Sequence, residues 1–351
     1  MSGMVYVAID AMGGDNAPAE AVKGAVAALN GREGFGVILT GDERAINREL
    51  AACNQYNDYA AGNPKRLIVV HAAEIIGNDD HPTAAIKEKK DSSLVRALRL
   101  VQEGAAAAAV SAGNTGALLV GGLSIIGRAK GVLRPALGVL LPGTGGFGYT
   151  FLIDAGANAD AKPQYLAQFA RMGSVYVEAV FGVKSPRVAL INMGTEREKG
   201  NALTKEAYGL LESGGLNFAG NIEARDIPLG GADVAVCDAF TGNIILKHTE
   251  GLSKALLSVI KKELMSGAVT KLGALLSKKA FANVKLRFDS SEVGGAPFLG
   301  LDGLLVKAHG NSDAKAFMNA VYKAVEFSGT GMEQLKGMFS QSRPDDNPDG
   351  E

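Results

Sequence analysis

The sequence predicts an α/β protein in which a mainly parallel β-sheet carries helices on both faces. Three observations support this fold class. Short, apolar, β-rich runs alternate with helical stretches along the 351 residues, as in chains built from βα units. Hydrophobic residues make up 47% of the chain and charged residues 21%, which is enough for a large core. Several runs end in polar or glycine-rich turns, and a parallel sheet gathers such turns at the carboxyl ends of its strands.

The predicted elements follow one another in βα order. Strand 4–11, MVYVAIDA, is rich in residues that favour strands, and it leads through the turn MGGDNAP into a helix at 19–29. The same alternation predicts strands at 35–41, 66–73, 105–110, 135–143, 149–158, 187–194 and 233–240, helices at 43–53, 92–103 and 163–180, and further helices after the turns at 111–116, 193–201 and 237–243.

The stretch GTGGFG at 143–148 matches the dinucleotide-binding pattern GxGxxG by letters alone. That fingerprint requires a strand before it and a helix after it. Here strand-like sequence stands on both sides, so a hairpin or a mobile loop is predicted instead.

Composition excludes several classes of protein. With a net charge of −1, the chain as a whole has no positive electrostatic field that would attract nucleic acid. Cys53 and Cys237 offer neither a disulfide framework nor a paired metal motif, which fits a reducing cytosol. The four histidines lack metal-ligand spacing, so no metal is expected. No signal peptide is visible, and no apolar run approaches the about 18 residues of a membrane span, so any membrane contact is expected to be peripheral.

Five strands are followed by polar turns, which are DAMGGDNAP, SAGNTG, DAGAN, MGTEREKGN and CDAFTGN. Any one of them can be explained as a strand-to-helix turn with a capping side chain. If all five lie at the same edge of a parallel sheet, they build one crevice lined by backbone N–H groups, hydroxyls and amides.

The turn SAGNTG at 111–116 has the composition of an anion site. Gly113 and Gly116 allow a ligand to approach the backbone, while Ser111, Asn114 and Thr115 supply donors ahead of a helix N-terminus. The GK[ST] ending of a nucleotide-triphosphate loop is missing, which favours a small anion such as phosphate. The turn carries no charge of its own. In the turn after strand 187–194, a lysine either neutralises an anion or is a solvated surface residue.

A basic helical segment spans 251–283. Between residues 252 and 282 it holds six lysines against one glutamate. Apolar residues at 252, 255, 256, 259 and 260 fall on one helical stripe, and glycines at 267 and 273 suggest a bend. Such a segment contacts an anionic membrane or an acidic partner, or it packs on its own domain or on a dimer mate.

Nine stretches together closely resemble the bacterial phosphate acyltransferases of phospholipid synthesis. They are DAMGGDNAP, KKDSSL, SAGNTGAL, LIDAGAN, NMGTEREKGN, GNIEARDI, DAFTGNIILKHTEG, GGAPFLGLDG and KAHGNSDAKA, in unbroken order from about residue 5 to 325. The sequence departs from the family pattern at Asn16, where His is frequent, at Val293, where Tyr is usual, and in a longer stretch at 51–66.

This resemblance implies a three-layer α/β/α fold like that of the isocitrate and isopropylmalate dehydrogenases. It implies one catalytic domain over 1–338, which includes the basic segment, and a disordered tail at 339–351. It also implies a cytoplasmic homodimer without a cofactor, held peripherally at the inner face of the cell membrane. There the enzyme moves an acyl group from acyl-[acyl-carrier-protein] to inorganic phosphate and passes acyl-phosphate to a membrane-embedded glycerol-3-phosphate acyltransferase.

The resemblance and the chemistry of the turns assign the expected site residues. Phosphate is already anionic and a thiol of pKa about 8–9 leaves easily, so the site needs donors that position phosphate and stabilise an oxyanion. The expected catalytic residues are Lys199 and Asn243, with Asp238 and His309 orienting them. The expected phosphate ligands are Ser111, Gly113, Asn114, Thr115, Gly13 and Gly14, and the expected contacts for membrane or carrier protein are Lys254, Lys261, Lys262 and Lys271.

The sequence offers three alternative functions. A phosphotransacetylase that uses acyl-CoA is the nearest. An NAD-dependent hydroxyacid dehydrogenase would need a fingerprint loop and usually a metal-binding aspartate cluster. A non-enzymatic membrane scaffold would leave the polar turns unexplained. The sequence leaves open the preferred acyl length, the choice between direct transfer and an acyl-enzyme, and which turn holds phosphate and which the pantetheine arm.

Overall fold

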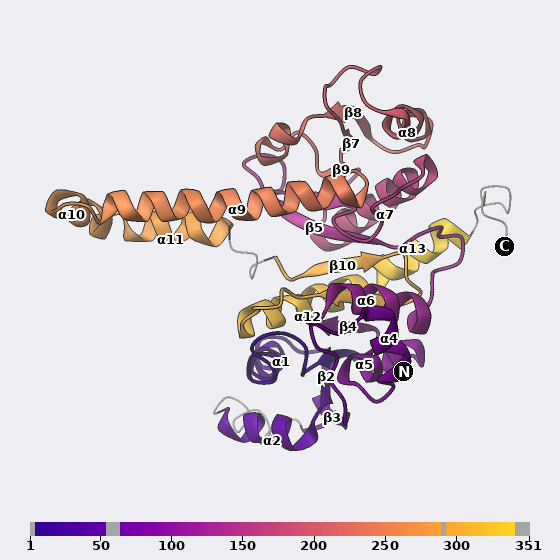
Figure 1. The fold of residues 1–351 in the computed structure, drawn as a ribbon, viewed down its shortest axis with the longest axis vertical. Coiled ribbons are helices and arrows are strands. Elements are labelled where there is room, and N and C mark those ends of the chain that lie inside the picture. The colour runs from indigo at the N-terminus through magenta and orange to yellow at the C-terminus, as the bar shows by residue number, and fades with distance from the viewer. Residues whose placement is uncertain (1–3, 54–63, 289–292, 341–351) are drawn as a thin grey trace.

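The computed structural model describes residues 4–53, 64–288 and 293–340, and it contains one sheet of eleven strands (Figure 1). The spatial order is β3-β2-β1-β4-β11-β10-β5-β6-β9-β7-β8. The strands are β1 (Val5–Asp10), β2 (Phe35–Gly41), β3 (Leu67–His71), β4 (Ala108–Ser111), β5 (Ala136–Pro142), β6 (Tyr149–Ile153), β7 (Val188–Ile191), β8 (Phe218–Ile222), β9 (Val234–Val236), β10 (Ala296–Leu299) and β11 (Leu304–Lys307).

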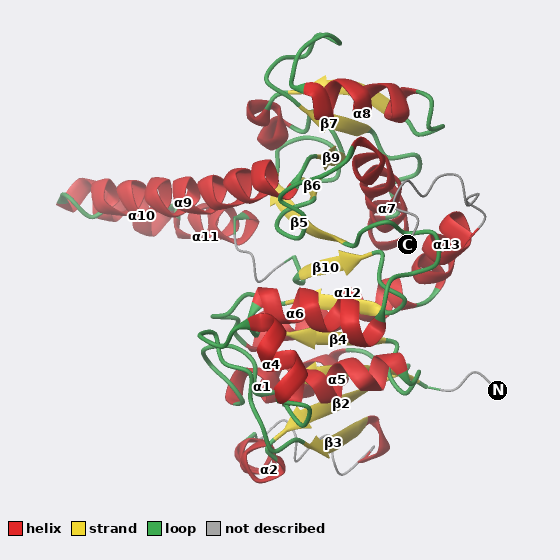
Figure 2. Ribbon diagram, turned by 45° about the vertical axis from the view of Figure 1, so that its right-hand side comes forward, coloured by secondary structure: helices red, strands yellow, loops and turns green. Residues whose placement is uncertain are grey.

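Helices cover both faces of this sheet, which gives the three layers predicted (Figure 2). They are α1 (Ala19–Gly31), α2 (Glu43–Ala52), α4 (Pro82–Glu88), α5 (Ser93–Gln102), α6 (Thr115–Gly121), α7 (Pro163–Phe181), α8 (Ala202–Glu212), α9 (Ala239–Leu264), α10 (Ala268–Leu276), α11 (Lys278–Arg287), α12 (Ala314–Ser328) and α13 (Thr330–Ser340). Short 3-10 helices cover Pro64–Arg66 and Ala224–Leu229, and a π-helical turn, Gly122–Ile126, continues α6.

The alternation of side chains along the strands builds a core on each face. On β1, Val7 and Ile9 pack into a cluster that includes residues of α1, α7 and α12. Ala8, between them, points to the opposite face and joins a cluster with residues of α5 and α6. Because side chains alternate with a period of two along a strand, a strand covered on both faces carries consecutive apolar residues, as at 7–9 in β1, 37–39 in β2 and 108–110 in β4.

Three antiparallel pairs interrupt the parallel sheet in its middle. β10 runs antiparallel to both β11 and β5, and β5 runs antiparallel to β6. The outer pairs are parallel, so β1 to β4 and β11 form one parallel set, while β6 to β9 form a second set of opposite sense along the ladder. The two halves of the sheet meet at β10 and β5, which pair through only two residues of each strand.

All eight predicted strands are present, and GTGGFG forms the turn of a β5–β6 hairpin, as predicted. The missed strands are β8, β10 and β11, and the missed helices include α4, α12 and α13. β10 and β11 have four residues each, and glycines surround them, so neither resembles the longer apolar runs that predicted the other strands.

The basic segment forms most of a helical arm, which we define as α9, α10 and α11, residues 239–287. In both ribbon views the arm projects from the body, with α11 lying along α9 and α10 at the tip (Figures 1 and 2). Gly267 precedes α10 and accounts for the predicted bend, whereas Gly273 lies within α10.

The carboxyl-terminal boundary differs from the prediction. Phe339 is 1% exposed and packs in the main core as part of α13, so the ordered chain continues past residue 338. The rest of the predicted tail, 341–351, lies outside the described residues.

Candidate functional site

Three loops from the first half of the sheet meet around Gly14. This residue has a φ of +99°, and a Cβ built on it would lie 2.8 Å from the Cβ of Ala112 and 2.9 Å from the carbonyl oxygen of Gly310. The backbone N–H of Asp15 donates to the same Gly310 oxygen at 2.7 Å. Glycine is therefore required here by backbone conformation and by close approach. We call residues 10–16, 111–116 and 308–313, which follow β1, β4 and β11, the first loop cluster.

Asp10 joins two of these loops. Its carboxylate, at the buried end of β1, accepts the Ser111 hydroxyl at 2.7 Å and the backbone N–H of Met12 at 3.2 Å. The Ser111 oxygen in turn accepts the N–H of Gly113 at 3.0 Å. Burial raises the pKa of the Asp10 carboxyl above its ordinary value, and hydrogen bonds from Ser93 and Ser111 oppose that rise. The side chain of Ser111, an expected phosphate ligand, thus already has two partners within the protein.

Gly13 lies directly over this network. A Cβ at Gly13 would lie 2.5 Å from the Asp10 carboxylate, 2.9 Å from the Gly113 nitrogen and 3.0 Å from the Ser111 oxygen. The structure therefore brings together Gly13, Gly14, Ser111 and Gly113, four of the six expected phosphate ligands.

Asn114 and Thr115 complete the first loop cluster at the start of α6. The Asn114 side chain accepts the N–H of Ala117 at 3.0 Å and donates to the carbonyl oxygen of Asn78 at 2.9 Å. Within the described ranges, the backbone N–H groups of Thr115 and Gly116 have no protein acceptor, as is usual in the first turn of a helix. These N–H groups and the Thr115 hydroxyl are the donors that remain for an anion.

A second loop cluster, residues 154–158 and 237–243, follows β6 and β9. At its centre Asp154 is fully buried. Its carboxylate accepts four backbone N–H groups and the side-chain amide of Asn158; the backbone donors are Leu137, Gly156, Ala157 and Asn158. Burial raises the pKa of this carboxyl, and the hydrogen bonds oppose the rise. Asp154 thereby fixes the loop against which α9 begins.

The start of α9 packs on that loop without a side chain between them. A Cβ on Gly242 would clash with the carbonyl oxygen of Asp154. Asp238 caps the helix, because its carboxylate accepts both the N–H and the hydroxyl of Thr241 at 2.9 Å. Asn243, the expected carbonyl donor, follows Gly242 and is exposed.

Lys199 lies apart from the first loop cluster. It is exposed in the loop after β7, where its carbonyl oxygen accepts the side-chain amide of Asn192 at 3.0 Å. β7 is six strand spacings from β4 in the sheet, which corresponds to roughly 29 Å across a sheet. Within the described residues, no hydrogen bond or ion pair joins the Lys199 loop to the SAGNTG loop.

The expectation of one crevice at one edge of the sheet is wrong in its geometry. The antiparallel pairs at β10 and β5 reverse the second set of strands, so the turns after β1 and β4 and the turns after β6, β7 and β9 end on opposite sides of the strand ladder. The five polar turns therefore form separate clusters, and their residues do not all line one site within a single chain.

Helix α9 extends from the second loop cluster towards the first. Lys247, on α9, is near enough to Lys307, at the end of β11, for its charge to act on that lysine. Burial first, and then the charge of Lys247, lower the pKa of the Lys307 ammonium. His309, an expected orienting residue, is exposed two residues beyond Lys307. Lys307 is not among the expected site residues because the short strand β11 has no strong local signal, although a lysine stands immediately before AHGNSD in the sequence.

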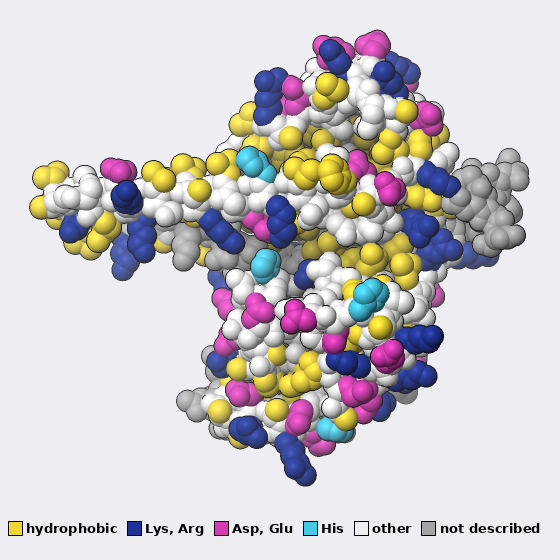
Figure 3. All heavy atoms as spheres, viewed as in Figure 1, with side chains coloured by type: hydrophobic (Ala, Val, Ile, Leu, Met, Phe, Trp, Pro, Cys, Tyr) yellow, Lys and Arg dark blue, Asp and Glu magenta, His cyan; other side chains and the backbone are white. Residues whose placement is uncertain are grey.

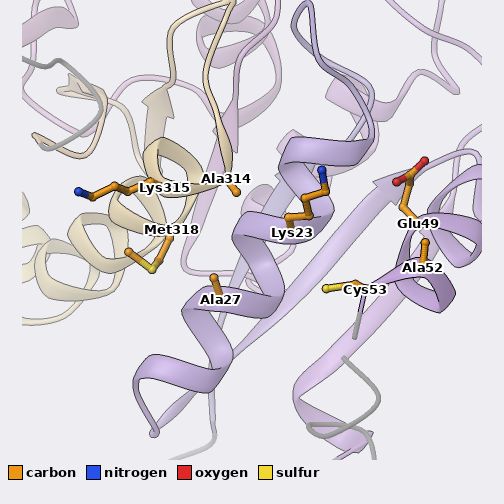
Figure 4. A pocket seen from close by; sticks show the side chains of 8 residues that line it. All are labelled: Lys23, Ala27, Glu49, Ala52, Cys53, Ala314, Lys315 and Met318. Atoms are coloured by element: carbon orange, nitrogen blue, oxygen red, sulfur yellow. The ribbon is translucent and has the colours of Figure 1, made fainter. Parts of the chain in front are cut away.

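A separate hollow of about 420 Å³ lies between α1, the end of α2 and the start of α12 (Figure 4). Lys23, Glu49, Cys53 and Met318 are among the side chains around it. None of the expected site residues lines it. In the described part of the chain, no three His, Cys, Asp or Glu side chains are grouped so that they could hold a metal ion.

The fold defines the class of the protein. Its architecture is that of a phosphotransacetylase from Streptococcus pyogenes, with a TM-score of 0.60, 17% identity and coverage of 93% of this chain and 95% of that one. A branched-chain phosphotransacylase from Enterococcus faecalis gives 0.58 at 14% identity, covering 93% and 99%. A putative 4-hydroxythreonine-4-phosphate dehydrogenase from Salmonella typhimurium gives 0.50 at 13% identity, with the same coverage. The protein therefore has the three-layer α/β fold that phosphotransacetylases and these dehydrogenases share.

The family follows from the sequence comparisons. The family described as fatty acid synthesis protein matches residues 5–335. Phosphate acyltransferases from Alkaliphilus oremlandii and Clostridium tetani are 50% and 47% identical over 92% of this chain and 93% of their own length. The chain belongs to this family of phosphate acyltransferases, which are enzymes of fatty acid and phospholipid synthesis.

Proposed function

We propose that the protein transfers a fatty acyl group from acyl-[acyl-carrier-protein] to inorganic phosphate and releases acyl-phosphate for phosphatidic acid and phospholipid synthesis. The first loop cluster is the observation that carries this proposal. Its free donors at the start of α6 suit a small anion, and the family membership supplies the reaction class.

The proposed chemistry needs little acid–base assistance. A phosphate oxygen attacks the thioester carbonyl carbon, the carbon–sulfur bond breaks, and the carrier leaves as a thiolate that solvent protonates. Rate acceleration then comes from positioning phosphate and from stabilising the tetrahedral oxyanion. In this proposal the N–H groups around Gly113 and Thr115 hold phosphate, and Asn243 donates to the carbonyl oxygen. Lys199 offsets negative charge, and Asp238 and His309 orient these groups.

For the same enzyme we propose peripheral contact with the inner face of the cell membrane through the helical arm. Its tip exposes apolar side chains, with Val269 at 85% and Leu276 at 80% of full exposure. Four lysines are exposed along the arm, namely Lys254, Lys261, Lys262 and Lys271. Figure 3 shows basic side chains on the arm beside a line of apolar side chains that reaches the tip. A helix with an apolar face and flanking cations binds at an anionic interface. Among the described helices, none is long and apolar enough to cross a bilayer.

We propose two protein partners in addition to the acyl carrier. A second copy of the chain covers the exposed stripe of Leu252, Leu256 and Val259 on α9 to form a homodimer. Each of these side chains is more than half exposed in the single chain, which leaves the stripe accessible to a second copy. At the membrane, a glycerol-3-phosphate acyltransferase embedded in the bilayer accepts the acyl-phosphate product.

One assay tests the proposed reaction. Purified protein is incubated with acyl-[acyl-carrier-protein] and phosphate, and hydroxylamine traps any acyl-phosphate as the hydroxamate. We expect trapped product that depends on both substrates. Greater activity with acyl-CoA would identify the phosphotransacetylase alternative instead, and reduction of NAD by a hydroxyacid, without trapped product, would identify a dehydrogenase.

A further inference from the structure

Lys307 occupies a central position beside the first loop cluster. It is the last residue of β11 and lies opposite Ser111 in the parallel register of β11 with β4. The next residue continues this contact, because the N–H of Ala308 donates to the carbonyl oxygen of Ser111 at 2.9 Å. On its other side, Lys307 lies opposite Ala296 of β10. The lysine therefore stands between SAGNTG and the middle of the sheet.

Among the described residues, the ammonium group of Lys307 has no counter-charge. The side chain is half-buried, and within that part of the chain its Nζ donates to the carbonyl oxygen of Ala308, at 3.3 Å, and to no other acceptor. No described carboxylate lies within 4.0 Å of it. Withdrawal of a cation from water without a paired anion is unfavourable. Burial accordingly lowers the pKa of Lys307.

A second lysine adds to this unfavourable charge. Lys247 is four residues beyond Asn243 on α9, so the two side chains lie on the same face of that helix. The charge of Lys247 further lowers the pKa of Lys307. Lys247 keeps an ion pair with Glu250 at 3.1 Å, whereas Lys307 has none. A bound anion would relieve the repulsion between the lysines and would supply the partner that Lys307 lacks.

We propose that Lys307 binds the phosphate substrate directly, together with the donors at the start of α6. This inference rests on the proposed function and adds to it a cationic side chain that is not among the site residues expected from the sequence. It also supplies the charge that SAGNTG lacks. A single ammonium group donates to phosphate as a point charge, without the two-pronged grip of an arginine, which leaves an oxygen of the nucleophile free to attack.

Two variants and a matched control test the role of Lys307. Lys307→Met removes the charge with little change in volume, and Lys307→Arg keeps a cation. Lys184→Met removes an exposed lysine from the loop before β7. Initial rates are measured by the hydroxylamine assay while phosphate and acyl-[acyl-carrier-protein] are varied separately, and melting temperatures are measured with and without inorganic phosphate.

We expect Lys307→Met to raise the KM for phosphate by about 10- to 100-fold, the effect of losing a charge-assisted hydrogen bond. The KM for the acyl donor should change little, and Lys307→Arg should raise the KM for phosphate less. The free protein should melt no lower than the wild type, because the variant removes an unpaired cation. Phosphate should raise the melting temperature of the wild type and of Lys184→Met but not of Lys307→Met.

The possible failures are distinguishable. A wild type that forms no trapped product with either acyl donor contradicts the proposed function. An active wild type whose Lys307→Met variant keeps its KM for phosphate overturns the present inference alone. A lower kcat with an unchanged KM for phosphate would also overturn it, because the lysine would then act on the carbonyl oxygen. If Lys307→Met does not fold, Lys307→Gln takes its place in the same measurements.

Discussion

The Ser111 hydroxyl already makes two hydrogen bonds within the protein, so its main role differs from direct contact with phosphate. Its hydroxyl donates to the buried Asp10 carboxylate and accepts from the N–H of Gly113. One hydroxyl thereby fixes the bend of the loop that precedes the free N–H groups of Thr115 and Gly116. We infer that Ser111 acts on phosphate by holding these donors in place.

Replacement of Ser111 by alanine should destabilise the protein as well as impair phosphate binding. The Asp10 carboxylate would lose its 2.7 Å partner in a buried position, and an unsatisfied buried group costs about 1–3 kcal/mol. Urea unfolding should show this loss. Ser213→Ala, which removes an exposed hydroxyl bonded within its own helix, should change stability little. Equal stability of the two variants would contradict the role assigned to the Asp10–Ser111 bond.

At the residue scale, the sequence predicted which turns are polar but not how their side chains are used. Ser111 and Asn114 are expected to contact an anion, and both are also bonded within the protein. Their partners, Asp10 and Asn78, are 101 and 36 residues away in the sequence, so no local pattern could have revealed these bonds. Lys307 escaped notice for a related reason, since a lysine's lack of a counter-ion is visible only after folding.

Helix α9 depends on one glycine for its position. At Gly242 the helix backbone touches the carbonyl of Asp154, whereas at Gly251, nine residues along the same helix, nothing lies within 4 Å of a built Cβ. Two glycines in one helix therefore have opposite requirements.

Alanine at these two positions should have opposite effects on stability. Gly242→Ala forces the helix away from Asp154, and overpacking of this kind costs about 1–3 kcal/mol. It should also displace Asn243 and so lower kcat. Gly251→Ala should raise the free energy of unfolding by about 0.5–1 kcal/mol, because alanine favours a helix interior. Thermal unfolding and the hydroxylamine assay measure both effects, and stabilisation by Gly242→Ala would refute the close contact.

The arm offers a prediction about its partner. Lys261→Glu combined with Lys262→Glu reverses two exposed charges near the tip. Binding to vesicles that contain anionic lipid should weaken by about 30-fold or more at low salt, because each basic residue near such a surface contributes about 1 kcal/mol. If the arm meets the acidic carrier protein instead, the KM for that substrate should rise. The control reverses Lys184 and Lys205 on the body. No change in either measurement would leave the arm a purely structural element.

The elements that the sequence predicted are those with strong local signals. Long apolar strands such as β2 and the hairpin around GTGGFG follow from composition and from turn residues. The short strands β10 and β11 depend on pairing with partners far away in the chain: β11 pairs with β4, and β10 pairs with β5. Tertiary pairing decides such strands. The two antiparallel pairs of β10 cancel, so the net reversal of the second half-sheet, on which the single-edge expectation failed, comes from the β5–β6 hairpin.

The whole molecule places Lys199 and the SAGNTG loop in opposite halves of one sheet. Lys199→Ala should lose most turnover if both halves serve one reaction. The fold should be retained, because Lys199 is exposed and its hydrogen bonds within the described chain, to Glu196 and Asn192, use its backbone N–H and carbonyl oxygen. Sedimentation should show an unchanged assembly. Lys205→Ala, on the neighbouring helix, is the control, and a near wild-type rate for Lys199→Ala would remove this lysine from the site.

The narrow junction between β10 and β5 has a mechanical consequence. Each half-sheet is held by long parallel ladders, but two residue pairs, Phe298 with Leu137 and Leu299 with Ala136, make up the strand contact between the halves. Helices supply the rest of the connection, because α7 packs against α12 and α13 across the junction and the rings of Tyr176 and Phe327 lie 5.0 Å apart. The relative position of the two loop clusters therefore depends more on this shared helical core than on the hydrogen bonds of the sheet.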